Sequence, residues 1–355
     1  MHTVFITGAA GYVGEMLCDQ FAKRDDVRLV IGLDKEPMTP FGRQIPKLVY
    51  VQSDLADQNW PEEVAKYQPD VVVHAAWQIR SLYGRSAEQW RLNVVASGRL
   101  FDFALSLPSV SRLIHFSTAA SYSARSSNTF DHYFTEDEDL RVDDYAYAKE
   151  KKVVEEDLRA RYENARKVGQ TCPDTIVVRP AAITGPRGRF MRVRFGLQSA
   201  LSGRLSGGVV NRMVKLLTSF VPATPGWVRQ FVHEDDVTDA IASFAFGDGV
   251  KGYEVYNLTP RGEPVFAGDM AEAVGKKILP VRPWMVRLAF AGFWHLTRGR
   301  IPTAPGSWRF YSYPILMNGD KLAKIHHCRY DSKDAFRSTL GRYEGFVPET
   351  ERRKS

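Results

Sequence analysis

The chain has 355 residues, 44% of them hydrophobic and 25% charged, a composition that fits a large globular protein and excludes a disordered, repetitive or fibrous chain. Its net charge of +7, from 48 Lys and Arg against 41 Asp and Glu, is too small a surplus to favour a nucleic-acid partner. The 3 cysteines are scattered and odd in number, so they exclude a disulfide framework and a Cys-x-x-Cys metal site. We therefore expect free thiols, no metal site and a cytoplasmic location.

The first predicted elements are a strand, a glycine-rich turn and a helix, in that order. A buried strand over residues 3–7 leads into Gly8-Ala9-Ala10-Gly11-Tyr12-Val13-Gly14, and a helical pattern follows. Glycines at such a turn permit close approach of the backbone to a pyrophosphate, whose charge the helix N-terminus stabilises. The next strand, over residues 28–33, ends on Asp34, at the spacing expected for a carboxylate that binds both ribose hydroxyls. Since this carboxylate would repel a 2′-phosphate, the sequence predicts NAD rather than NADP as the cofactor.

Three further apolar strands follow, over residues 48–51, 71–74 and 113–116, separated by helical patterns. This alternation predicts an α/β fold, a Rossmann-type doubly wound parallel sheet with helices on both faces. Ligands bind at the carboxyl edge of such a sheet. The residues expected at that edge are Asp54, Leu55, His74, Ala75, Ala76, Ser117 and Thr118. We interpret His74 as a strand-end histidine and not as a ligand.

A tyrosine and a lysine one helical turn apart can remove the proton of a substrate hydroxyl. The free phenol has a pKa of about 10, and a nearby ammonium group stabilises the phenolate. The sequence offers two such pairs, Tyr145 with Lys149 and Tyr147 with Lys151. Helical steps from the second pair reach apolar residues that can face a core, whereas steps from the first reach charged residues. We therefore predict Tyr147 as the general base and Lys151 as the residue that tunes it.

These motifs resemble those of the extended short-chain dehydrogenase/reductase family, in its NAD-dependent epimerase/dehydratase group. The similarity extends from TGAAGYVG at residues 7–14 to FVHEDD at residues 231–236. It implies that Thr118 orients the substrate hydroxyl; the Asp-Glu pair of the family's sugar 4,6-dehydratases is replaced by Ala119-Ala120, so dehydration is not expected. The cofactor contacts that the resemblance implies are Gly8, Gly11, Tyr12, Val13, Gly14, Asp34, Asp54, Leu55, Ala75, Ala76, Asn93, Ser117, Tyr147, Lys151 and Pro180.

The substrate side departs from the family pattern. Ala182 stands where many nucleotide-sugar enzymes of the family carry a substrate-binding asparagine, and Thr184 stands in place of a tyrosine. The arginines on the substrate side instead favour a nucleotide-sugar substrate, because guanidinium groups bind diphosphates. The arginines that we consider for this role are Arg187, with its neighbours Arg189, Arg192 and Arg194, and Arg229, which matches the family's diphosphate-binding arginine.

Three hypotheses of function follow from these residues. The first is an NAD-dependent epimerase or dehydrogenase that acts on a secondary hydroxyl of a nucleotide-sugar-like substrate by Tyr/Lys-assisted hydride transfer. The second is a hydroxysteroid- or isoprenoid-type alcohol dehydrogenase, which Ala182, Thr184 and the late aromatic residues favour. The third is a non-catalytic NAD-binding regulatory protein.

We predict two lobes that are interleaved in sequence. Residues 1–180 form the NAD-binding domain, to which 229–248 return; residues 181–228 and 249–348 form the substrate lobe; and 349–355 form a tail. The apolar stretch from Trp284 to Leu296 is about 13 residues long, too short to span a bilayer. We therefore expect a buried or interfacial helix and no membrane partner, with contact to a membrane surface as the alternative. Family analogy implies a homodimer. Aromatic residues that either line an apolar pocket or pack in the core are Trp284, Phe290, Trp294 and Trp308.

Overall fold

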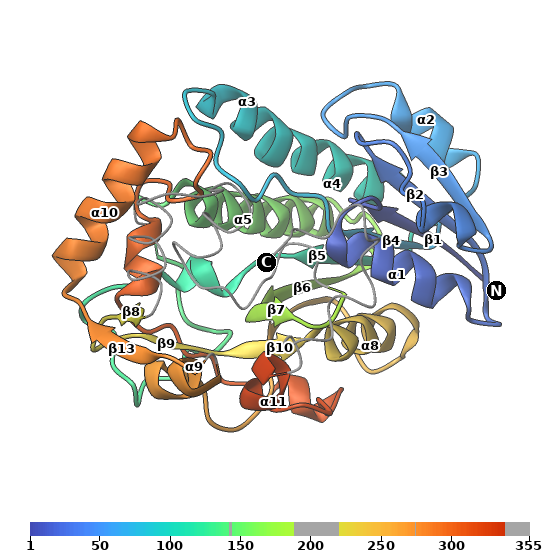
Figure 1. Cartoon of the computed structure of the whole chain (residues 1–355). Coiled ribbons are helices and arrows are strands. Elements are labelled where there is room, and N and C mark those ends of the chain that lie inside the picture. The colour runs from blue at the N-terminus through green and yellow to red at the C-terminus, as the bar shows by residue number, and fades with distance from the viewer. Residues whose placement is uncertain (142–143, 188–219, 274, 338–355) are drawn as a thin grey trace.

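The computed structural model describes residues 1–141, 144–187, 220–273 and 275–337, and its centre is a seven-stranded sheet (Figure 1). All neighbouring strands of this sheet are parallel. In spatial order they are β11 (Tyr253–Leu258), β6 (Asp174–Pro180), β5 (Arg112–Phe116), β4 (Val71–His74), β1 (His2–Thr7), β2 (Val27–Asp34) and β3 (Leu48–Gln52). The strand order reverses its direction at β1, as in a doubly wound Rossmann sheet, so the predicted fold class is confirmed.

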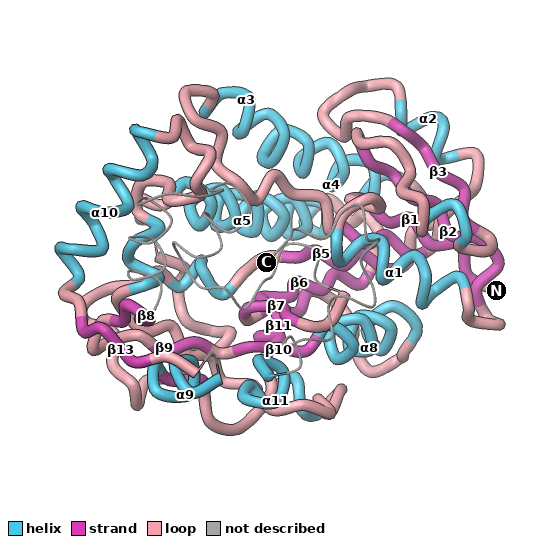
Figure 2. The backbone as a smooth tube through the Cα atoms, viewed as in Figure 1, coloured by secondary structure: helices cyan, strands magenta, loops and turns pink. Residues whose placement is uncertain are grey.

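Helices cover both faces of this sheet (Figure 2). Side chains alternate between the two faces of a strand, so Val4 and Ile6 of β1 enter one apolar core and Phe5 enters the other. This double coverage is the physical reason why the strands read as continuous apolar runs. The helices are α1 (Tyr12–Ala22) and α8 (Glu234–Phe246) on one face, and α2 (Trp60–Ala65), α4 (Ala96–Ser106) and α5 (Ala146–Lys167) on the other.

Shorter elements complete the described part of the chain. The small strands pair as β7 (Ala182–Thr184) with β10 (Phe231–His233), β9 (Val228–Arg229) with β12 (Val265–Phe266), and β8 (Phe220–Ala223) with β13 (Lys277–Pro280). The remaining helices are α3 (Ser86–Trp90), α9 (Ala267–Ala273), α10 (Pro283–Leu296) and α11 (Ser332–Arg337). A π-helical turn (Arg91–Val95) and 3₁₀ turns at Gly42–Gln44, Ala119–Tyr122, Ser307–Tyr311 and Leu322–Lys324 connect these elements.

The division into lobes differs from the sequence-based assignment in one respect. Strand β11 pairs with β6 along its whole length and is the edge of the main sheet, whereas the sequence places 249–348 entirely in the substrate lobe. The reason is that Val255, Tyr256 and Leu258 of β11 are buried in the apolar cores on the two faces of the main sheet. The tail at 349–355 and the arginines Arg189, Arg192 and Arg194 lie outside the described residues. None of the described helices is long and apolar enough to cross a lipid bilayer.

Candidate active site

The glycine-rich turn between β1 and α1 leaves no room for side chains. Gly8 has φ +77°, and a Cβ atom there would lie 2.8 Å from the backbone of Ala76. A Cβ atom at Gly14 would lie 2.0 Å from the carbonyl oxygen of Gly8. Only glycine fits both positions. The turn therefore presents bare backbone at the N-terminus of α1, the environment that a pyrophosphate requires.

Asp34 lies at the end of β2, beside this turn. Its carboxylate accepts hydrogen bonds from the backbone N–H groups of Ala10 and Glu36, both at 3.0 Å. Burial raises the pKa of Asp34, and these two N–H donors lower it. The first bond fixes the carboxylate relative to the glycine turn. The residues present therefore fit a dinucleotide, with backbone for its pyrophosphate and an acceptor for its ribose.

Asp54, one of the two residues predicted near the adenine, pairs with an arginine that no sequence motif indicates. Asp54 accepts a hydrogen bond from the Ala56 N–H at 2.9 Å and forms an ion pair with Arg91. Leu55 is buried beside it. Arg91 begins the π-helical turn, far from Asp54 in sequence, and no motif links the two residues.

A buried carboxylate holds the loop that follows β4, which begins with the half-buried Ala75 and Ala76. Asn93 accepts a hydrogen bond from the Gln78 N–H at 2.7 Å and donates one to Glu150 at 2.7 Å. Glu150 also accepts one from Gln89 at 2.9 Å. Asn93 thus positions the strand-end loop, and its predicted contact with the cofactor stays a prediction. Glu150 is 5% exposed and had no sequence signal beyond its place beside Lys151.

Thr118, Tyr147 and Lys151 meet at the carboxyl edge of β5. The Tyr147 hydroxyl is hydrogen-bonded to the Thr118 side chain. Lys151 is buried; its ammonium donates to the carbonyl of Phe116 at 2.5 Å and lies 3.6 Å from the ring centroid of Trp77. Lys149, in the alternative register, is exposed. The helix therefore directs the second pair, and not the first, toward the strand end.

The protonation states of this group are set mainly by burial. Burial raises the pKa of Tyr147, and the hydrogen bond to Thr118 lowers it. Burial also lowers the pKa of Lys151 well below its usual range, while the charges of Glu155 and Glu150 raise it. Burial thus favours the neutral forms of both groups, whereas the two carboxylates favour the charged form of Lys151.

Ser117 and Pro180 belong to the buried support of the site. The Ser117 hydroxyl donates to Glu155 at 2.6 Å. Arg179 donates to the same carboxylate at 3.0 Å and to the Tyr122 hydroxyl at 2.6 Å. All these side chains are buried, and Pro180 ends the same strand as Arg179. Ser117 therefore faces a buried ion pair, and its predicted contact with the cofactor stays a prediction.

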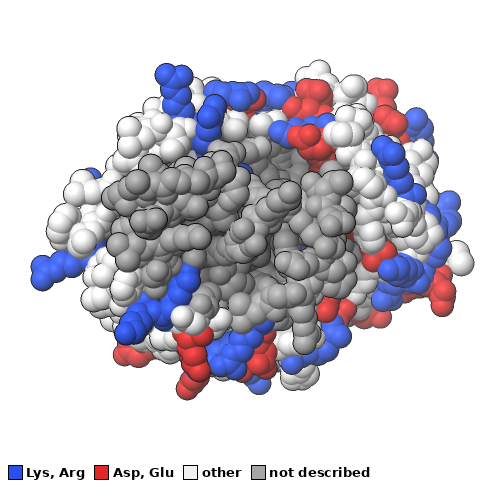
Figure 3. All heavy atoms as spheres, in the orientation of Figure 1, with Lys and Arg blue, Asp and Glu red and all other residues white. Residues whose placement is uncertain are grey.

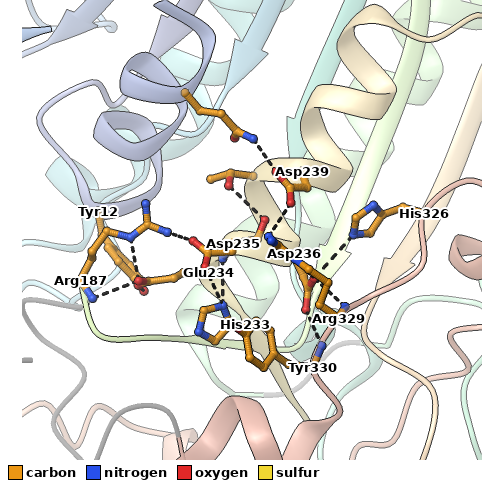
Figure 4. A network of polar contacts seen from close by, with 12 residues as sticks. Tyr12, Arg187, His233, Glu234, Asp235, Asp236, Asp239, His326, Arg329 and Tyr330 are labelled. Carbon is orange, nitrogen blue, oxygen red and sulfur yellow. Dashed lines mark hydrogen bonds and ion pairs between the residues drawn. The ribbon is translucent and has the colours of Figure 1, made fainter. Parts of the chain in front are cut away.

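Tyr12 and Arg187 meet on one buried carboxylate (Figure 4). The Tyr12 hydroxyl donates to Glu234, which is fully buried. The Arg187 backbone N–H and Nε donate to the same Glu234 at 3.0 and 2.7 Å, and its Nη2 donates to Asp235. Two carboxylates thus neutralise the guanidinium that the sequence assigns to a diphosphate. Val13, the next residue in α1, packs against the apolar core.

Arg229 reaches toward an aromatic segment. Its Nη2 donates to the carbonyl of Phe310 at 3.0 Å, and its guanidinium lies 5.3 Å from the ring centroid of Tyr311. Phe310 in turn contacts Tyr145 at 5.1 Å between centroids, and Tyr145 contacts Tyr147 at 5.6 Å. Arg229 therefore borders the surroundings of Tyr147, the predicted base.

Two further groups of polar residues carry structural roles. His74 is hydrogen-bonded to Thr7 and Ser97, both at 2.8 Å, and burial lowers its pKa to about 3. It is thus a neutral, buried strand-end histidine. Among the described residues, the group whose side chains could together ligate a metal ion consists of Asp236, His326 and Cys328, whose ligand atoms lie within 4.8 Å of one another.

That cluster is already occupied by protein donors. Asp236 accepts hydrogen bonds from the backbone N–H groups of Arg329 at 2.8 Å and Tyr330 at 3.2 Å, and the Arg329 Nε lies 3.7 Å from its carboxylate (Figure 4). Burial raises the pKa of the Cys328 thiol to about 12, so the thiolate that a metal needs is unfavourable. We therefore assign Asp236 a structural role, and the absence of a metal stays a prediction.

The sheet, the glycine turn and the tyrosine–lysine pair define a Rossmann protein with an NAD-binding fold. The chain belongs to the NAD dependent epimerase/dehydratase family, whose model matches residues 4–259. The predicted family is therefore confirmed. Among curated proteins it is similar to Uncharacterized protein Mb0513 of Mycobacterium bovis and to Uncharacterized protein Rv0501 of Mycobacterium tuberculosis. Each match is 30% identical over 142 residues, 39% of this chain and only 37% of the relative's length.

Solved structures with the same fold include several enzymes bound to NAD. The chain is 19% identical to the Bordetella bronchiseptica enzyme WbmG in complex with NAD (TM-score 0.66; 97% of this chain, 94% of that chain). It is 16% identical to UDP-glucuronic acid 4-epimerase from Bacillus cereus in complex with UDP-glucuronic acid and NAD (0.66; 97% and 100%). It is 17% identical to dTDP-glucose 4,6-dehydratase from Bacillus anthracis in complex with NAD (0.68; 97% and 97%). At these identities the similarity establishes the fold.

Proposed function

We propose that this chain is an NAD-dependent epimerase or dehydrogenase that oxidises a secondary hydroxyl, with Tyr147 as the base. The observation that carries this proposal is the meeting of Thr118, Tyr147 and Lys151 at one sheet edge, on the same side as the glycine turn. Family membership supports NAD as the cofactor. NAD, when bound, would supply the hydride acceptor and a positively charged ring.

Each side chain then has a distinct task. Thr118 holds the substrate oxygen within reach of the Tyr147 hydroxyl, to which it is already hydrogen-bonded. Tyr147 takes the hydroxyl proton as the substrate carbon is oxidised. Lys151 stabilises the phenolate by its charge. A positive charge is needed because burial raises the pKa of Tyr147, which opposes phenolate formation. An epimerase would return the hydride to the opposite face of the ketone, whereas a dehydrogenase would release it with the reduced cofactor.

Nucleotide sugars are the first substrate class to test. Neighbours of the same fold were solved with UDP-glucuronic acid or UDP. Arg229 borders the site and is half-buried, which suits a diphosphate contact. The proposal for Arg187 is weaker, because Glu234 and Asp235 already neutralise its charge.

A second candidate, an apolar alcohol of the steroid or isoprenoid type, is favoured by a specific observation. The aromatic residues Trp77, Tyr145 and Phe310 lie around Tyr147, directly or through one another, at centroid distances of 5.1 to 6.4 Å. Aromatic rings bind apolar surfaces more readily than they bind diphosphates. Ala182 adds no polar group to this environment.

The test compares Tyr147→Phe with Tyr145→Phe, two variants that each remove one tyrosine hydroxyl group. Both variants and the wild type are assayed with NAD, a panel of UDP-sugars and a panel of apolar secondary alcohols, by NADH absorbance and by product chromatography. We expect Tyr147→Phe to lose roughly 100-fold or more in turnover with NAD affinity unchanged, and Tyr145→Phe to keep its activity. The reverse result would place the base at Tyr145.

The nucleotide that the protein carries separates the remaining readings. Denaturing the purified protein and identifying the released nucleotide by mass spectrometry should give NAD; tightly held NAD favours an epimerase, and exchangeable NAD a dehydrogenase. Retained NAD without turnover on either panel would favour the regulatory reading. The cytoplasmic location and the homodimer stay predictions.

A further inference from the structure

Helix α10 and strand β13, which follow each other in the chain, expose several large apolar side chains to solvent. Trp284 is 58% exposed, Leu288 64% and Leu296 86%, and Trp294 is the buried residue of this helix. All four residues of β13 are exposed, among them the apolar Ile278 and Leu279. Exposed apolar residues that occur singly need no explanation, but a patch of this kind marks an interaction surface. We call α10 and β13 together the apolar face.

The stretch of chain that carries the apolar face has charged residues of one sign. Residues 273–319 contain no Asp or Glu. In Figure 3 the surface at the left, where Figure 1 places α10, shows white and blue spheres without red. The basic residues of this stretch are Lys276, Lys277, Arg282, Arg287, Arg298, Arg300 and Arg309.

We propose that the apolar face docks on an anionic lipid surface. A helix that carries tryptophan and leucine on its exposed side and arginines at its flanks is the pattern of an interfacial helix, which lies in the plane of the membrane. Long arginine side chains can bury their stems in the apolar layer and keep their charge among the lipid phosphates. Docking is distinct from spanning, for which no described helix is suited. This proposal departs from the sequence-based expectation that there is no membrane partner.

Charge argues against a second copy of the chain as the occupant. In a two-fold symmetric interface the same patch meets itself. The apolar face would then bring two segments of net positive charge together, which repel each other. An anionic lipid surface offers the complementary charge and an apolar layer at once.

The apolar face lies next to the proposed active site. Phe290 of α10 contacts Tyr311 at 5.0 Å between ring centroids. The adjacent Phe310 contacts Tyr145, which contacts Tyr147. Near the other end of the helix, the Tyr83 hydroxyl is 3.2 Å from His295. Docking would therefore bring the surroundings of Tyr147 close to the lipid surface, a consequence that rests on the proposed function, whereas docking itself does not.

The test is co-sedimentation of the full chain with vesicles of phosphatidylcholine alone or mixed with phosphatidylglycerol. We expect the wild type to bind the anionic vesicles roughly tenfold more tightly, and high salt to remove much of this preference. The double variant Trp284→Gln/Leu288→Gln should lose binding to both kinds of vesicle. Arg282→Gln/Arg287→Gln should lose mainly the preference for anionic lipid.

Val168→Gln is the matched control, because Val168 is 80% exposed but lies at the end of α5, away from the apolar face. It should bind as the wild type does. Unchanged NAD affinity in all variants shows that each is folded, and keeps this test independent of Tyr147. Absence of binding to anionic vesicles would overturn the proposal. So would a dimer, seen by analytical ultracentrifugation, that Trp284→Gln/Leu288→Gln converts to monomer.

Discussion

The ammonium group of Lys151 lies 3.6 Å from the centroid of the Trp77 indole ring, a cation–π contact within the proposed active site. Trp77 Nε1 is buried and has no hydrogen-bond partner among the described residues, so the ring face is the part of the indole that acts on the lysine. A π face stabilises the charged lysine and not the neutral one. Trp77 therefore opposes the effect of burial, which lowers the pKa of Lys151.

Replacing Trp77 should move the pH dependence of NAD binding. In Trp77→Leu the ammonium loses about 1–2 kcal/mol of cation–π stabilisation, which lowers the pKa of Lys151 further. Because the family resemblance makes Lys151 a cofactor contact and an ammonium group donates more hydrogen bonds than a neutral amine, NAD affinity should begin to decline at a lower pH than in the wild type. Trp77→Phe keeps a π face and should shift less. Calorimetric titrations over a pH series check this; identical profiles for Trp77→Leu and the wild type would contradict it.

The strands, the glycine turn and the burial of Lys151 rather than Lys149 could be predicted because each depends on local spacing. Apolar runs mark strands buried on both faces, and Lys151 is on the buried side of α5 while Lys149 is on the exposed side. The roles of Arg187 and Trp77 could not be predicted in this way. Arg187 meets Glu234 across 47 residues, and Trp77 meets Lys151 only after β4 and α5 have packed together.

The exposure of α10 shows a second limit of structure prediction from the sequence. Its residues read equally well as a pocket wall or as core, since composition alone does not say which element covers a helix. The structure buries Trp294 but leaves Trp284 58% exposed. The ion pair of Asp54 with Arg91 could not be predicted either, because the fold and not a sequence motif brings its two partners together.

Asp34→Asn should weaken discrimination between NAD and NADP. The asparagine is neutral and accepts fewer hydrogen bonds from the ribose hydroxyls, so NAD affinity should fall by about tenfold. Loss of the negative charge also removes repulsion of a 2′-phosphate, so NADP affinity should rise relative to NAD. The ratio of the two dissociation constants is the measurement. Asp57→Asn, a change at an exposed carboxylate that pairs with Arg91 at 3.6 Å, is the control; an unchanged ratio in Asp34→Asn would disprove the role of Asp34.

Glu155→Gln should destabilise the fold far more than Glu156→Gln, the same change one residue later. Glu155 and Arg179 form an ion pair in which both side chains are 4% exposed, so the neutral glutamine leaves a buried guanidinium uncompensated. The expected cost is about 3–5 kcal/mol. Glu156 is 55% exposed and pairs with Lys152 on the surface, so its loss should cost about 0–1 kcal/mol. Urea unfolding gives both free energies, and equal values for the two variants would refute the argument.

His115→Phe should make the protein less sensitive to acid. His115 is fully buried, stacks on His74 at 5.2 Å between centroids, and neither of its ring nitrogens has a hydrogen-bond partner among the described residues. Burial lowers its pKa well below 6.5 in the folded state. Below pH 6.5 the unfolded chain therefore binds a proton that the folded chain does not, so the stability is complete above that pH and falls as the pH decreases.

Each such histidine removes about 1.4 kcal/mol of stability per pH unit below its unfolded pKa. His115→Phe abolishes the pH-dependent contribution of His115 and leaves that of His74. It also removes buried polar atoms whose missing hydrogen bonds cost about 1–3 kcal/mol. The variant should therefore equal or exceed the wild type in unfolding free energy above pH 6.5, and its advantage should grow as the pH is lowered. Urea unfolding of both proteins across a pH series measures this, and a constant difference between them at every pH would show that His115 is not buried in its neutral form.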